Sequence, residues 1–164
     1  MKNVFYYAML ATAMLTTFAA PVSARLTPFI EGQASVIDGD TIEIHGERIR
    51  LHGIDAPESD QHCTDGNGAV WRCGKAAAFY LDDLIGQQTV SCEIKDEDQY
   101  FRPIAKCSIK GQDLDLNATL VEMGLAVAYR QFSEDYASQE EVARSAKSGV
   151  WNGPFMMPWD WRRR

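Results

Sequence analysis

Residues 30–58 read IEGQASVIDGDTIEIHGERIRLHGIDAPE, and their pattern is the strongest indication of the fold. Apolar residues alternate with polar ones on both sides of the turn His45-Gly46-Glu47, and they are Ile42, Ile44, Ile49 and Leu51. Because successive side chains of a strand point to opposite faces, the basic residues between them point away from this apolar face: Arg48, Arg50 and His52. The stretch therefore predicts strands with one buried face.

The rest of the chain predicts a helix, a strand hairpin and two more helices. Gly74–Ile85 has the apolar spacing of a helix and stops at Gly86. Residues 90–94 and 104–109 are strand-like, with a polar segment, Lys95–Tyr100, between them. Two further helices are expected over Leu116–Met123 and from a capping box at Ser138–Glu141 to about residue 149. This order favours an α+β fold: a five-stranded Greek-key OB-type β-barrel with three α-helices.

The composition is that of a globular protein. Of 164 residues, 46% are hydrophobic and 24% are charged, which excludes disordered and low-complexity classes. The formal net charge of −7 argues against a generally basic nucleic-acid-binding protein. A polyanion would need a local cluster of arginines and lysines, or a bound cation.

Residues 1–24 are interpreted as a secretory signal peptide. Lys2 precedes an apolar run from Val4 to Ala20, and Pro21-Val22-Ser23-Ala24 ends it with a small-x-small pattern. A retained membrane anchor is the alternative, because the run is nearly long enough to span a bilayer. We expect cleavage after Ala24, one domain over residues 25–164 without a further membrane segment, and export to a periplasm or out of the cell.

Four cysteines follow the proposed cleavage site, and an oxidising compartment favours their pairing. Cys92 and Cys107 lie on the two strand-like runs of the hairpin, so they can face each other. Cys63 and Cys73 would then close a glycine-rich loop. A zinc site with His62 is the alternative, but its spacing fits none of the usual zinc patterns. A thiol oxidoreductase is disfavoured because the chain has no C-x-x-C motif.

Several motifs together resemble the staphylococcal-nuclease-like (thermonuclease) family, in its exported bacterial form. They are VIDGDT at 36–41, RLHGIDAPE at 50–58, DQYFR at 98–102, LNATLV at 116–121, GLA at 124–126 and GVW at 149–151. The resemblance extends from about Gln33 to Trp151. Any one motif is weak evidence alone, whereas their occurrence in this order is specific.

The resemblance implies a Ca²⁺ site. Its ligands would be the carboxylates of Asp40 and Asp55 and the main-chain carbonyl of Ala56, and oxygen ligands of this kind suit Ca²⁺. Ala56 stands where the family more often has threonine, which a carbonyl ligand tolerates. Asp38 is expected to be a turn residue beside the metal.

The resemblance also implies the catalytic groups of a nuclease that acts on DNA and RNA. Arg50 and Arg102 would hold a phosphodiester and stabilise the charge of its transition state. Glu58 would be the general base that activates water. The family cleaves the P–O5′ bond and leaves 3′-phosphate ends. We expect a monomer that prefers single-stranded substrates.

Three features are open to two interpretations. Tyr100 and Tyr129 resemble family tyrosines that contact phosphate or a base, but they could equally pack at the rim. Phe101 stands where the family usually has glycine, so the loop that presents Arg102 could differ in shape. The tail Trp159–Arg164 is expected to pack its tryptophans on the barrel and to leave its arginines solvated, with nucleic-acid contact as the alternative.

Two functions from different classes follow from these observations. The first is the exported calcium-dependent nuclease. The second is a catalytically silent nuclease-like barrel that binds an anionic ligand or partner in the cell envelope. The presence of both arginines, Glu58 and both aspartates favours the enzyme.

Overall fold

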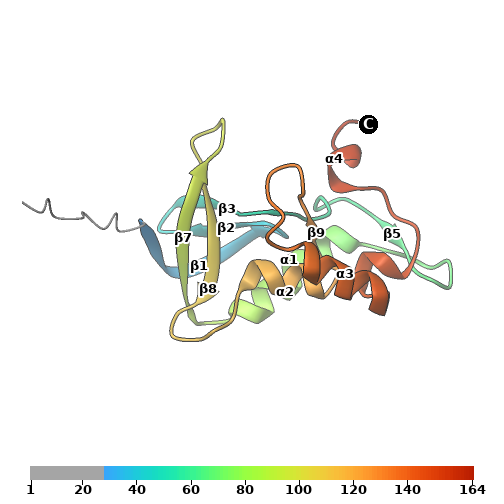
Figure 1. The fold of residues 1–164 in the computed structure, drawn as a ribbon, viewed down its shortest axis with the longest axis horizontal. Helices are drawn as coiled ribbons and strands as arrows, with labels where there is room; N and C mark the ends of the chain where they lie inside the picture. Colours follow the sequence, from blue (N-terminus) through green and yellow to red (C-terminus); the bar gives the residue numbers. More distant parts are fainter. Residues whose placement is uncertain (1–27) are drawn as a thin grey trace, which may run out of the picture.

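The computed structural model describes residues 28–164 (Figure 1). The predicted signal peptide, residues 1–24, lies outside the described residues. Five strands form a closed barrel in the order β1-β2-β3-β8-β7, and they are β1 (Phe29–Asp38), β2 (Thr41–Ile44), β3 (Glu47–Leu51), β7 (Thr89–Glu97) and β8 (Pro103–Ile109). Only the β3–β8 pair is parallel among these neighbours. The predicted five-stranded barrel is confirmed.

The alternating pattern of residues 42–51 predicted the core correctly. The side chains of Ile42, Ile44, Ile49 and Leu51 are at most 1% exposed. They pack inside the barrel with residues of α1 (Cys73–Ile85) and α2 (Leu116–Glu122). Burial of this apolar surface is the main force that closes the barrel.

The helices lie beside the barrel, to its right in Figure 1. They are α1, α2, α3 (Ala137–Ala146), a 3₁₀ turn η1 (Gly149–Asn152) and a short α4 (Pro158–Trp161). Two short strand pairs, β4 (Ile54–Asp55) with β9 (Val127–Ala128) and β5 (Cys63–Thr64) with β6 (Val70–Trp71), connect them to the barrel. The three predicted helices are present, and α4 is an addition. In the described residues no helix has the length and apolarity to cross a bilayer.

The predicted capping box at Ser138 is wrong. Helix α3 starts at Ala137, so its N-cap is Tyr136, two residues before Ser138, and no side chain caps its first turn. The Ser138 hydroxyl instead donates to the side chain of Gln139 at 2.8 Å. Because the Tyr136 ring is buried against Gly53 and the core, packing fixes the start of the helix.

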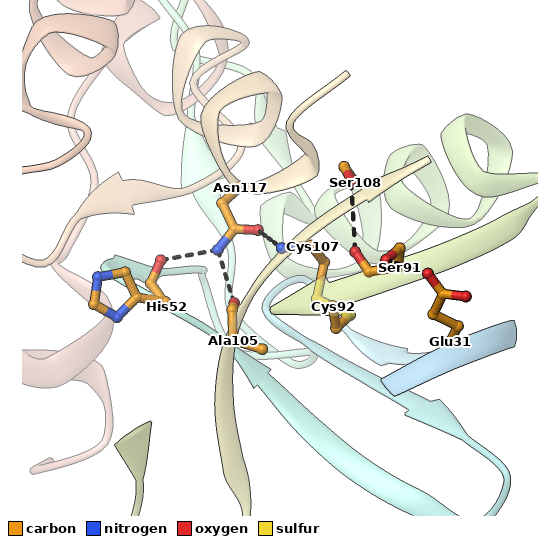
Figure 2. Close-up of a disulfide and its surroundings, with 8 residues drawn as sticks. All are labelled: Glu31, His52, Ser91, Cys92, Ala105, Cys107, Ser108 and Asn117. Atoms are coloured by element: carbon orange, nitrogen blue, oxygen red, sulfur yellow. Dashed lines mark hydrogen bonds between the residues drawn. A yellow bond between two sulfur atoms is a disulfide. The ribbon is translucent and has the colours of Figure 1, made fainter. Parts of the chain in front are cut away.

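Both predicted disulfides are present. Cys92 and Cys107 are direct cross-strand partners of β7 and β8 inside the core (Figure 2). Cys63 and Cys73 join β5 to the start of α1 and pack with Val127 and Val150 in a second apolar cluster. Because Cys63 and Cys73 are bonded to each other, they are not thiolate ligands, which contradicts the zinc alternative.

A buried asparagine connects α2 to the barrel next to the Cys92–Cys107 disulfide (Figure 2). The Asn117 amide donates to the carbonyl oxygens of His52, at 2.9 Å, and Ala105, at 3.2 Å. Its own oxygen accepts the N–H of Cys107 at 3.1 Å. All of its hydrogen-bonding groups are therefore used inside the protein, which fixes the turn between β3 and β4.

Candidate functional site

The first wall of the site is the turn between β1 and β2. A bulge between Val36 and Asp38 ends the regular pairing, and the Asp38 side chain accepts the N–H of Asp40 at 3.0 Å. Asp38 is thus a turn residue, as expected. A Cβ atom at Gly39 would lie 2.7 Å from the Ala56 Cβ and 2.8 Å from the Ala77 Cβ. The absent side chain at Gly39 lets the turn lie directly on Ala56.

Arg50 joins the two aspartates that the sequence suggested as metal ligands. Its Nη1 donates to Asp40 Oδ1 at 3.0 Å, and its Nη2 donates to Asp55 Oδ1 at 2.8 Å. Asp55 is fully buried and Asp40 is 4% exposed. Burial raises the pKa of Asp55, although its arginine partners oppose this shift. Burial also opposes the charge of Arg50, but the two aspartates outweigh it and raise the pKa of Arg50.

The loop that carries Glu58 is fixed by its backbone. The N–H of Gln61 donates to the Glu58 carbonyl at 2.7 Å, and the Gln61 side chain accepts the N–H of Glu58 at 3.2 Å. A Cβ atom at Gly74 would overlap the main-chain oxygen of Glu58, so only glycine at the start of α1 allows this close approach. The Glu58 side chain remains about one-third exposed.

Arg102 lies on the loop between β7 and β8. Asp98 of the same loop accepts the N–H groups of Tyr100 and Arg102, and its second oxygen accepts the Arg102 Nε–H at 2.7 Å. Desolvation raises the pKa of Asp98, but these hydrogen bonds outweigh it and hold the pKa below its ordinary value. Phe101 has a φ of 62° and is 79% exposed. The loop therefore takes a left-handed conformation at Phe101, which glycine would adopt without steric strain.

Six of the sequence-predicted site residues line one hollow of about 400 Å³: Asp40, Arg50, Ala56, Glu58, Tyr100 and Arg102. Asp55 lies beneath it, in contact with Arg50.

Tyr129 is the predicted site residue that lies elsewhere. It lines a second hollow of about 670 Å³, where its ring stacks on Trp159 with the ring centres 5.4 Å apart. The arginines of this second hollow have acidic partners, because Arg130 and Arg144 pair with Glu140, and Arg163 pairs with Asp160.

Sequence reasoning missed an arginine of the site. The expectation that the tail arginines are solvated is wrong for Arg162, which lines both hollows. Its Nη1 and Nη2 donate to the two oxygens of Asp55 at 3.0 Å and 2.7 Å, and its Nη1 also donates to Glu58. The only signal in the sequence was the aromatic and basic composition of residues 159–164.

The donor atoms of the site fit a hard cation. Within residues 28–164, no three His, Cys, Asp or Glu side chains are grouped so that they could hold a metal. A cation here would use the carboxylates of Asp40 and Asp55 with the Ala56 carbonyl and water, all of them oxygen donors. Two buried carboxylates need positive charge nearby, which Arg50 and Arg162 supply in this structure.

Comparison with known proteins gives matches over most of the chain. Residues 48–153 match the family described as staphylococcal nuclease homologue. The succinoglycan biosynthesis protein ExoI of Rhizobium meliloti is 40% identical over 153 residues, which is 88% of this chain and 80% of that protein. The micrococcal nuclease of Shigella flexneri is 33% identical over 144 residues, which is 78% of this chain and 77% of that protein.

A third relative is an uncharacterized endonuclease of Haemophilus influenzae, 33% identical over 115 residues, which is 68% of this chain and 57% of that protein. The family match includes Arg50, Asp55, Glu58 and Arg102, whereas Asp40 lies before it and Arg162 lies after it. On the strength of this match and of the barrel that carries the site, the chain belongs to the family of staphylococcal nuclease homologues.

Proposed function

We propose that the protein is an exported, Ca²⁺-dependent nuclease that hydrolyses phosphodiester bonds in DNA and RNA. Membership of the nuclease family and the similarity to a micrococcal nuclease support a nuclease of the hydrolase class. The proposal of a Ca²⁺-dependent reaction rests on one observation, the contact of Arg50 with both Asp40 and Asp55. Glu58 and Arg102 line the same hollow.

In this proposal Asp40, Asp55 and the carbonyl of Ala56 hold Ca²⁺. The cation would supply Lewis-acid chemistry and a template for the phosphate. Asp40 already has a fixed position, because its second oxygen accepts the N–H of Ala56 at 2.9 Å. This hydrogen bond keeps two of the three proposed ligands next to each other.

The arginines bind the substrate phosphate and stabilise the charge that grows on it during reaction. Arg50 is 21% exposed, so its guanidinium reaches the hollow from a buried base. Arg102 approaches from the opposite loop. Glu58 accepts a proton from the attacking water, which requires its carboxylate to be free of Arg162. Cleavage of the P–O5′ bond would leave 3′-phosphate ends.

The tyrosines contribute to substrate binding in two places. Tyr100 is 69% exposed at the rim of the first hollow, where its ring can meet a phosphate or a base. Tyr129 faces the second hollow and is covered in part by Trp159. Exposed aromatic rings suit single-stranded substrates, because only unpaired bases present a free face for stacking.

The experiment is hydrolysis of single-stranded DNA by the purified protein at pH 9 in millimolar Ca²⁺, and then in EGTA. We expect cleavage in Ca²⁺, its loss in EGTA, and products with 3′-phosphate ends. The site groups are carboxylates and guanidiniums, so activity should persist to alkaline pH without a loss near the pKa of histidine. Intact DNA in Ca²⁺ would refute the nuclease proposal.

A second candidate is a catalytically silent barrel that binds an anionic ligand or partner in the cell envelope. The similarity to a protein named for succinoglycan biosynthesis favours it. The same assay separates the two candidates, because a silent barrel leaves DNA and RNA intact in every condition. Retention of the protein on an anionic polysaccharide column would then support the second candidate.

The proposed location is a periplasm or the outside of the cell, where the protein acts as a monomer after cleavage at Ala24. The two disulfides support an oxidising compartment. Intact mass of protein recovered outside the cytoplasm tests the cleavage. A species there that retains Met1 would contradict it.

A further inference from the structure

The C-terminal segment 156–164 is attached beside the Glu58 loop by contacts that do not involve Arg162. The buried Gln61 side chain donates to the Met156 carbonyl at 2.6 Å. The Trp161 Nε1–H donates to the Asp60 carboxylate at 3.1 Å. Trp159 stacks on Tyr129. These contacts hold the chain directly before Arg162 and bring its guanidinium to the site.

The guanidinium of Arg162 takes the acceptor atoms that a cation would need. Asp55 Oδ2 accepts from Arg162, and Asp55 Oδ1 accepts from both Arg162 and Arg50. Both oxygens of this fully buried carboxylate are therefore engaged by positive groups. Glu58, the proposed base, is paired with the same guanidinium. The structure thus has an internal cation where Asp55 and Glu58 meet.

We propose that Arg162 is a tethered counter-cation of the site, and that a divalent cation binds at Asp55 only when it displaces this guanidinium. The inference rests on the proposed Ca²⁺ site. It assigns a role to a residue from outside the part of the chain that matches the family. Displacement also releases Glu58, so cation binding and exposure of the proposed base become one coupled event.

The side chain of Arg162 is 37% exposed, so water can replace its contacts when it leaves. Asp55, in contrast, is fully buried and always requires a positive partner. If the Arg162 guanidinium occupies Asp55 in most molecules, only the remaining fraction can bind the cation. The apparent dissociation constant is then the intrinsic one divided by that fraction. Removal of Arg162 should therefore strengthen cation binding.

The test measures Ca²⁺ binding by isothermal titration calorimetry, without substrate. We expect the dissociation constant to fall about tenfold or more in Arg162→Gln. Arg163→Gln is the matched control, because it removes one charge from the neighbouring residue, whose partner is Asp160. The control should change the constant by less than about threefold. Arg162→Lys keeps the charge but lacks the planar guanidinium, so its dissociation constant should lie between those of Arg162→Gln and Arg163→Gln.

A second measurement separates displacement from simple loss of charge. The Nε–Hε NMR signal of Arg162, assigned by its loss in Arg162→Gln, should move towards the position of a solvated arginine as Ca²⁺ is added. A signal that stays in place at saturating Ca²⁺ would overturn the proposal, even if the affinity changes. If Arg162→Gln does not fold, Arg162→Lys gives the same assignment, because lysine has no Nε–Hε group of this kind either.

The outcomes also separate this inference from the proposed function. Equal Ca²⁺ affinity in Arg162→Gln and in the unaltered protein would overturn the role of Arg162 alone. Absence of Ca²⁺ binding in all variants at millimolar concentration would overturn the calcium site, and the inference with it.

Discussion

The two sides of the first hollow are built in different ways. On the barrel side, Arg50 of β3 contacts Asp40 and Asp55, and both acceptors are buried. On the loop side, Arg102 is held by Asp98 of its own loop, next to the exposed Phe101. The barrel side therefore depends on closure of the fold, whereas the loop side depends on a few local hydrogen bonds. Changes on the barrel side should have the larger effects.

The largest expected effect comes from the groups that the proposal places at the reaction. Arg50→Lys and Glu58→Gln should each lower kcat/KM on single-stranded DNA by about 10²–10⁴-fold. Lysine lacks the planar fork that contacts both aspartates. Steady-state kinetics at saturating Ca²⁺ measures the loss, and far-UV circular dichroism checks the fold. Activity within threefold of the unaltered protein would contradict these roles.

The next largest effect concerns the disulfides. Each closes a loop of roughly 10–15 residues, so replacing a pair by alanine should lower the free energy of unfolding by about 2–3 kcal/mol. Urea unfolding under two-state conditions measures this.

The two pairs differ in what else should change. Replacement of Cys63 and Cys73 should also alter tryptophan fluorescence, because this disulfide packs in one cluster with Trp71, Trp151 and Trp159. Replacement of Cys92 and Cys107, which lie in the barrel core, should leave the fluorescence of the folded protein unchanged. If both variants have the fluorescence spectrum of the unaltered protein, the second cluster does not depend on its disulfide.

A smaller effect is expected at Asp98. Asp98→Asn removes the charge that pairs with Arg102, and because this pair is partly exposed the loss of stability should be about 1 kcal/mol or less at neutral pH. The pKa of Asp98 lies below its ordinary value in the folded protein, so the stabilisation is present above the unfolded pKa and disappears as pH falls through the folded pKa.

Thermal unfolding of both proteins from pH 7 to pH 2 measures this difference. The two curves should converge at the acidic end. A difference in stability that grows as the pH falls would contradict the assignment of the pair.

The smallest effect is expected at Phe101. Its φ of 62° strains a residue with a side chain, so Phe101→Gly should raise the stability by up to about 1 kcal/mol. Phe101→Ala keeps the Cβ atom and should give no gain, which makes it the matched control. Differential scanning calorimetry compares the three proteins. A loss of stability in Phe101→Gly would contradict the strain assigned to this position.

Local sequence patterns were enough to predict the barrel and to name six residues that line the first hollow. Alternation along residues 42–51 identified the buried face, because the side-chain period of a strand is fixed by its geometry. The hairpin placed Cys92 opposite Cys107 for the same reason. The ordered motifs indicated the nuclease family, which the family match confirmed. Each of these inferences uses residues that are near in sequence or whose order is characteristic.

Tertiary structure decided the features that depend on docking. Asn117 connects α2 to β8 and to the end of β3, and no periodic pattern predicts such a buried polar contact. The start of α3 followed the packing of Tyr136 rather than the capping box that the sequence suggested.

Arg162 is the clearest case. The sequence alone determined that the tail is aromatic and basic, and that two aspartates and a glutamate stand in nuclease motifs. It did not determine that Arg162 pairs with Asp55, because these residues are 107 positions apart. Their contact exists only when the stacking of Trp159 on Tyr129 and the hydrogen bond of Trp161 to Asp60 bring the segment to the site. The residues next to an arginine in the sequence do not show whether it is solvated or contacts a buried carboxylate. For Arg162 the difference arises because folding removes water from Asp55.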